Sequence, residues 1–184
     1  LPEFPAGKPL FIFASHFHAD HYAPVIFQLG EKRENVFYIL SKEIGKKIPE
    51  EYRKRYKDRI RLVKAGERFC LNISEESLIV ETFHSTDEGV AFWLSCEGKE
   101  IYHAGDLNNW WWEGEDMAWN RNMAASYKQE GKSFPGARRI WHLSRSIRGR
   151  SSGFIWALPV LWSRRTQNGF SRCISGKIIR LYQN

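Results

Sequence analysis

Cysteine is scarce in this chain of 184 residues, and the chain contains no long apolar run. Its three cysteines, Cys70, Cys96 and Cys173, lie far apart and include no CxxC pair. This spacing excludes a disulfide framework, so the sequence predicts a protein of the reducing cytoplasm. No apolar stretch approaches the roughly 18 residues of a membrane-spanning helix, which excludes a transmembrane protein. The N-terminal residues also lack the basic start and apolar stretch of a signal peptide.

Acidic residues are missing from the C-terminal part of the chain. Residues 1–130 carry 17 Lys and Arg against 21 Asp and Glu, a net charge of −4. Residues 131–184 carry 11 Lys and Arg and no acid, so the formal net charge of +7 comes wholly from this part. We therefore expect an ordinary domain over residues 1–130 and a basic, atypical tail over residues 131–184.

Apolar runs of strand length alternate with helical segments in the first 130 residues. Strands are predicted at residues 9–14, 36–40, 60–63, 78–83, 90–95 and 100–103, with a hairpin turn at 96–99. Helices are predicted at residues 23–29, where Gly30 should end the helix, and at 41–46, 49–60 and 117–128. Residues 49–60 could form a nucleic-acid-binding helix, but their mixed charges favour a solvated amphipathic helix. This alternation predicts a layered α/β domain.

Three histidines and one aspartate lie within six residues directly after the first predicted strand. They are His16, His18, Asp20 and His21 in the pattern HxHxDH. At the end of a strand, alternate residues point to one side, so His16 and His18 can face one point while Asp20 and His21 follow as the chain turns. Imidazole and carboxylate groups are the ligands that zinc and similar divalent ions prefer. The motif therefore predicts a metal site.

Two further predicted strands end in a residue that can bind a metal. His84 follows the run at 78–83, and Asp106 follows the strand at 100–103 in a Gly-Asp turn. Each alone is typical of an ordinary strand end or turn. Strand ends gathered at one edge of a sheet are where α/β proteins assemble their sites, so we expect both residues near the HxHxDH motif.

With these motifs in this order, residues 9–130 resemble the metallo-β-lactamase fold superfamily of metal-dependent hydrolases. Residues 84–92 and 102–108 are most similar to small bacterial members akin to the ascorbate-phosphate lactonases. The resemblance implies an αββα sandwich that holds one or two divalent ions, zinc first, with manganese or iron as alternatives. It implies that the first ion is held by His16, His18 and His84, the second by Asp20 and His21, and that Asp106 bridges both.

The resemblance also implies roles around the metals. Asp20, beside the attacking water, would orient it or accept its proton. Asp87 and His103 are candidates to hydrogen-bond the ligand imidazoles, with a plain surface or strand-end role as the alternative. Trp110 and Trp111 are candidates for an aromatic wall against the substrate, with packing onto the core as the alternative.

The function that follows is hydrolysis of an ester, lactone or phosphodiester of a small molecule by a metal-bound hydroxide. A nuclease of the same superfamily acting on RNA or DNA, or a non-catalytic truncated fragment, are the alternatives. Members of the superfamily usually carry strands ahead of HxHxDH, so we expect the chain to be truncated at its start. A last metal-binding histidine is also expected, and His142, the only histidine after Asp106, lacks the matching context.

The tail does not resemble a nucleic-acid-binding arm, although it is basic and contains three tryptophans. Such arms are usually poor in large apolar residues, whereas residues 154–162 are strongly apolar. We interpret the tail as the product of a shifted reading frame. With suitable codons, residues 140–150 and 169–176 read two nucleotides later spell segments typical of these hydrolases, and the second includes a histidine. A nucleotide sequence without an intact family-like frame would contradict this hypothesis.

Overall fold

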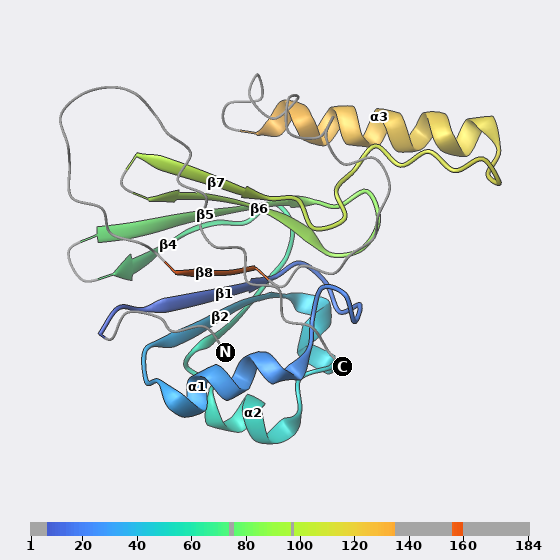
Figure 1. The fold of residues 1–184 in the computed structure, drawn as a ribbon. Coiled ribbons are helices and arrows are strands. Elements are labelled where there is room, and N and C mark those ends of the chain that lie inside the picture. Colours follow the sequence, from blue (N-terminus) through green and yellow to red (C-terminus); the bar gives the residue numbers. More distant parts are fainter. Residues whose placement is uncertain (1–6, 74–75, 97, 135–155, 160–184) are drawn as a thin grey trace.

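A computed structural model describes residues 7–73, 76–96, 98–134 and 156–159, which form a mixed α/β structure. Two four-stranded sheets lie face to face, with α1 and α2 outside one sheet and α3 outside the other (Figure 1). The strands are β1 (Leu10–Ala14), β2 (Val36–Ser41), β3 (Ile60–Val63), β4 (Arg68–Ile73), β5 (Glu76–His84), β6 (Val90–Cys96), β7 (Lys99–His103) and β8 (Trp156–Pro159). The helices are η1 (Pro24–Phe27), α1 (Gln28–Lys32), η2 (Lys42–Lys46), α2 (Glu50–Arg55) and α3 (Met117–Ser133), where η marks a 3-10 helix.

The first sheet has the strand order β3-β2-β1-β8. β1, β2 and β3 are parallel because helical segments connect them, and β8 pairs with β1 in the antiparallel direction. The predicted end of the first helix at Gly30 is wrong, since α1 continues to Lys32. A Cβ atom at Gly30 would lie 2.5 Å from the Tyr38 hydroxyl and 3.0 Å from the Tyr56 ring. Gly30 therefore makes room for two buried tyrosines and does not end the helix.

The predicted helix over residues 49–60 is much shorter in the structure. α2 ends at Arg55, and Tyr56 leaves the helical conformation with φ −112° and ψ 22°. Its ring is buried against the helix side of the first sheet, and the chain then turns directly into β3. The mixed charges lie on the surface as predicted, with a 2.6 Å ion pair between Lys54 and Glu50.

The second sheet is antiparallel in the order β4-β5-β6-β7. β4 does not stand out in the sequence, because its exposed residues alternate with half-buried ones and its apolar run is short. The predicted hairpin between β6 and β7 is confirmed, with Cys96 opposite Lys99 and Gly98 at φ +71°. Asp116 caps the start of α3, and its carboxylate accepts a 2.6 Å hydrogen bond from the backbone N–H of Trp119.

Three apolar clusters fill the three spaces between the four layers. β1 supplies two of them in alternation: Leu10, Ile12 and Ala14 face α1 and α2, whereas Phe11 and Phe13 face the second sheet. β6 does the same on the other side, since Phe92 faces the first sheet and Trp93 faces α3. This period of two explains why β1 and residues 90–94 of β6 are apolar, because both of their faces are covered.

α3 continues through residue 130, where the charge changes, and ends at Ser133. The division into a domain and a tail stays a prediction from the charge pattern. Of the tail, the structure describes only residues 131–134 and β8. His142 and the two segments on which the reading-frame hypothesis depends lie outside the described residues. In the part of the chain that the structure describes, every helix is too short or too polar to cross a membrane.

Candidate metal centre

The HxHxDH motif forms a tight loop at the end of β1. The carbonyl of His18 accepts hydrogen bonds from the backbone N–H groups of His21 (2.9 Å) and Tyr22 (2.8 Å). This turn folds the chain back on itself and places the His16 and His21 rings 4.1 Å apart. His16 is fully buried, His21 is half-buried, and His18 and Asp20 are exposed. The loop therefore presents ligand-type groups from the protein interior out to the solvent.

Asp106 reaches the same place from the second sheet, just after β7. Its Oδ2 lies 3.3 Å from His16 Nε2, and its Oδ1 lies 3.1 Å from His21 Nε2. Its backbone carbonyl accepts a 3.0 Å hydrogen bond from the Trp110 indole N–H and lies 3.2 Å from the Thr86 hydroxyl. One carboxylate thus faces two imidazoles, and the main chain of Asp106 is held by one side chain of its own loop and by one from the loop between β5 and β6.

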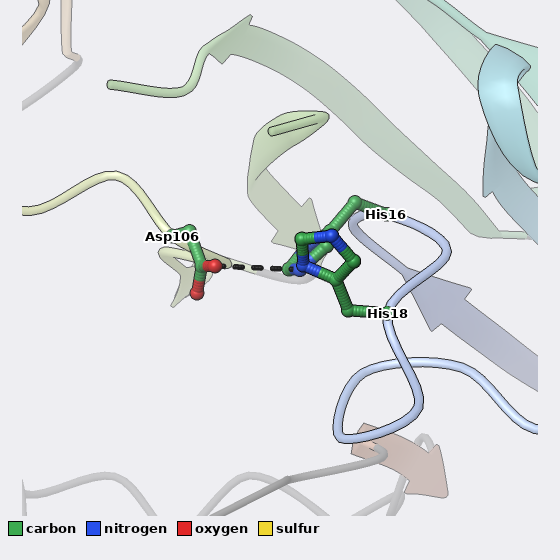
Figure 2. A group of neighbouring side chains, drawn as sticks. All are labelled: His16, His18 and Asp106. Carbon is green, nitrogen blue, oxygen red and sulfur yellow. Dashed lines mark ion pairs between the residues drawn. The ribbon is translucent and has the colours of Figure 1, made fainter. Parts of the chain in front are cut away.

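The structure brings together five of the predicted ligands in two overlapping sets. One set is His16, His18 and Asp106, and the other is His16, Asp20 and His21; within each, the ligand atoms lie within 4.8 Å of one another. Figure 2 shows the first set, with the Asp106 carboxylate turned toward the histidines of the β1 loop. Sequence separation between the loop and Asp106 is large, so the packing of the two sheets assembles the group.

The donor atoms fit a divalent cation. Among the described residues, the buried Nε2 of His16 makes no hydrogen bond, although it faces the Asp106 carboxylate. Its 3.3 Å distance to Oδ2 matches the spacing of two ligands on one tetrahedral zinc ion with bonds of roughly 2.0–2.1 Å. A buried nitrogen without a hydrogen-bond partner is costly, and a cation between nitrogen and carboxylate would satisfy both.

The electrostatics keep these groups in the protonation states that metals need. Burial, together with the charge of His21, lowers the pKa of His16 to about 4. Burial alone would raise the pKa of Asp106, but the hydrogen bond and charge of His21, with the charges of His16 and His18, outweigh it and lower the pKa. At neutral pH His16 is therefore uncharged and Asp106 is ionised, and both can bind a cation without losing a proton.

No protein-family model matches the chain, and no curated protein matches it either. The chemistry of this centre is therefore inferred from the residues and their geometry.

His84 stands apart from the two ligand sets. It is the last residue of β5, opposite Val90 of β6, and its side chain is exposed. Among the described residues it belongs to neither group of potential metal ligands. The assignment of His84 to the first metal therefore stays a prediction that rests on the sequence pattern.

Asp87 and His103 both lie near the centre. Burial and the charges of Asp106 and Glu88 raise the pKa of Asp87, so the Asp87 carboxyl is within electrostatic reach of Asp106. His103 is buried, with its ring stacked 5.9 Å from Phe92, and its Nδ1 accepts a 3.3 Å hydrogen bond from the Gly105 N–H. Burial, with the charges of His21 and His16, lowers the pKa of His103 to about 3. His103 is therefore a neutral group under the Asp106 turn.

The tryptophans differ in their surroundings. Trp110 is half-buried, donates to the Asp106 carbonyl and stacks on Trp112 at 6.0 Å and 20°. Trp111 is 58% exposed and Trp112 is 54% exposed. The buried Asn120 side chain holds the Trp112 backbone through two hydrogen bonds of 2.9 Å, one accepted and one donated. Exposed indole surface therefore lies on a fixed segment that continues from the Asp106 turn.

Sequence reasoning missed three residues that hold the HxHxDH loop. Ser15 is fully buried, and its hydroxyl lies 3.0 Å from His16 Nδ1. Gly89 at φ +75° packs against the Ser15 carbonyl and the His16 Cβ, and Gly105 at φ +54° packs against the Ser15 side chain. The sequence does show a small residue directly before His16 and a glycine in each of the two later motifs. The contacts of these glycines with Ser15 and His16 follow only from the fold.

Proposed function

We propose that the protein is a metal-dependent hydrolase that cleaves an ester, a lactone or a phosphodiester of a small molecule. The observation that carries this proposal is the meeting of His16, His18, Asp20, His21 and Asp106 at one place, with the buried His16 Nε2 aimed at a carboxylate. Zinc is the ion that the nitrogen and carboxylate donors favour, with manganese or iron as alternatives.

In this proposal the residues of the centre have different roles according to their position. When bound, a divalent ion supplies Lewis acidity: it lowers the pKa of a water molecule and polarises a carbonyl or phosphoryl group. Asp106 and His16 form the buried part that would hold the ion. The Asp20 side chain is 45% exposed, with its Oδ2 3.4 Å from His21 Nε2. A carboxylate on the solvent side of the centre can orient a water molecule and accept its proton, so Asp20 is the general base in this proposal.

We also infer that the two-sheet arrangement is of the metallo-β-lactamase type. Support comes from helices on both outer faces, and from the HxHxDH loop and Asp106 at strand ends of opposite sheets that meet at one edge. Trp110 and Trp111 follow the Asp106 turn, and the exposure of Trp111 supports a role for this segment as a wall against a substrate.

Metal binding and turnover by the whole chain test this function. We expect chelator-treated protein to bind at least one equivalent of Zn²⁺ and, once loaded, to cleave one class among nitrophenyl esters, lactones and phosphodiesters. The D106N substitution should weaken zinc binding more than about tenfold, because it removes a charged ligand. D116N is the matched control, since Asp and Asn are equally good helix N-caps.

Two outcomes would contradict the proposal. If the protein binds less than one equivalent of every metal and turns over none of the substrates, it is a non-catalytic fragment. Cleavage of single-stranded RNA without activity on the small substrates would favour the nuclease alternative.

A further inference from the structure

We propose that the Ser15 hydroxyl is a positioning group that selects the tautomer of His16 and orients the His21 ring for metal binding. This inference rests on the proposed metal centre. Ser15 binds no metal in this scheme, and it acts through the two imidazoles that it touches.

The geometry places one hydroxyl between two histidines. Ser15 Oγ lies 3.0 Å from His16 Nδ1 and 3.5 Å from His21 Nδ1. The opposite nitrogens of the same rings, the two Nε2 atoms, lie 3.3 Å and 3.1 Å from the oxygens of Asp106. Both rings therefore lie between the serine on one side and the carboxylate on the other. The hydroxyl can accept from Nδ1–H of His16 and donate its own proton to Nδ1 of His21, whose Nε2–H then faces Asp106.

The tautomer of His16 is defined by which ring nitrogen, Nδ1 or Nε2, carries the proton. When Ser15 Oγ accepts a hydrogen bond from Nδ1–H of His16, the lone pair is on Nε2 and points toward Asp106. A metal-binding nitrogen must present this lone pair. In the other tautomer, Nε2–H would point at the carboxylate, and that proton would have to leave before an ion could bind. In the structure, Nε2 of His16 makes no hydrogen bond within the described residues, so no hydrogen-bond partner holds a proton on it.

The surroundings keep Ser15 fixed. Its carbonyl accepts a 3.0 Å hydrogen bond from the Val90 N–H, which joins the end of β1 to the start of β6. A Cβ atom on Gly105 would lie 2.6 Å from Ser15 Cβ and 2.9 Å from Oγ. The side chain is fully buried and packs against Gly105, and its hydroxyl lies beside both Nδ1 atoms. A serine is the polar residue small enough for this place.

The test compares S15A with S41A in the whole chain. Ser41 is a buried serine at the end of the neighbouring strand β2, and its hydroxyl faces Glu43 rather than a histidine. Both substitutions remove one buried hydroxyl, so a general loss of packing affects both alike. The first measurement is the tautomer of the His16 ring by ¹⁵N NMR of metal-free protein at pH 8. The second is zinc affinity in competition with a chelator.

We expect His16 of the wild-type protein and of S41A to carry its proton on Nδ1, and His16 of S15A to shift toward Nε2–H. Zinc affinity should fall about tenfold in S15A, at the lower end of losses at residues that support metal ligands, and stay unchanged in S41A. Nε2–H as the main tautomer of His16 in the wild-type protein would overturn the inference even if S15A does not fold. Equal tautomers in all three proteins would also overturn it. The NMR measurement needs no metal, so failure of zinc to bind would reject the proposed function separately.

Discussion

Replacement of Gly89 by alanine should damage the candidate metal centre through backbone geometry alone. Gly89 has φ +75°, a conformation that costs a residue with a Cβ roughly 1–2 kcal/mol. The added Cβ would also overlap the Ser15 carbonyl and lie 2.6 Å from His16 Cβ. Since carbon atoms pack at about 3.5–4.0 Å, the end of β1 must move by roughly 1 Å. Overpacking of this kind costs about 1–3 kcal/mol more.

Gly66 provides the matched control for this substitution. It has φ +80°, almost the same conformation, but a Cβ atom there would meet nothing within 4 Å. G66A should therefore cost only the backbone part, about 1–2 kcal/mol. The difference between the two variants isolates the contact of residue 89 with Ser15 and His16, and we expect it to be about 1–3 kcal/mol.

Urea unfolding of both variants gives their free energy of unfolding, and zinc titration gives their zinc affinity. G89A should lose both stability and zinc affinity, because the shift of Ser15 and His16 displaces the ring that faces Asp106. G66A should lose stability and keep its zinc affinity. The reasoning is refuted if the two variants lose the same free energy of unfolding, or if G89A binds zinc as tightly as the wild-type protein.

Three further predictions concern the supports of the centre. The free energy of unfolding should decrease as the pH falls from about 6.5 to about 3. The reason is that His103 of the unfolded chain takes up a proton in this range, whereas the buried His103 does not. Urea unfolding of H103Q should therefore show a weaker dependence on pH over this range. W110F should keep the stacked ring but lose the hydrogen bond to the Asp106 carbonyl, and zinc affinity should fall severalfold in titration while the far-UV spectrum stays unchanged. N120A should cost about 2–3 kcal/mol in thermal unfolding, because the N–H and C=O of Trp112 lose their partner.

The parts of the fold that follow from sequence are those where local pattern and burial agree. β1 and residues 90–94 of β6 are covered on both faces, so they are continuous apolar runs that indicate strands without further information. β4 has one exposed side, and its short alternation of Arg68, Phe69 and Cys70 is too weak to mark a strand. In the sequence Gly30 resembles a helix end, because the tyrosines that require its small size lie on β2 and beyond α2. These are contacts that no local pattern contains.

In the candidate centre too, some features follow from the local sequence and others only from tertiary contacts. Ligand-type residues at strand ends are visible in sequence, and the meeting of His16 with Asp106 follows once the two sheets pack. The residues that orient them are ordinary serine, threonine and glycine, and only the tertiary contacts distinguish Ser15 and Thr86 from other small residues. His84 has the right position in the pattern, yet its exposed side chain lies in neither ligand set of the described residues.

The shared use of His16 bears on how many ions the described ligands can hold. Both sets include His16, and its Nδ1 lies beside Ser15, so Nε2 is the one nitrogen left for a metal. An imidazole nitrogen has a single lone pair and binds one ion, so the two sets compete for the same atom. One tight equivalent of zinc is therefore the binding that these side chains support as they stand. A second equivalent needs ligands other than His16, and His84 is the predicted ligand whose rotation would supply a new nitrogen. Loss of one of two bound equivalents in H84A would show that the pattern in the sequence, rather than the present side-chain positions, describes the loaded centre.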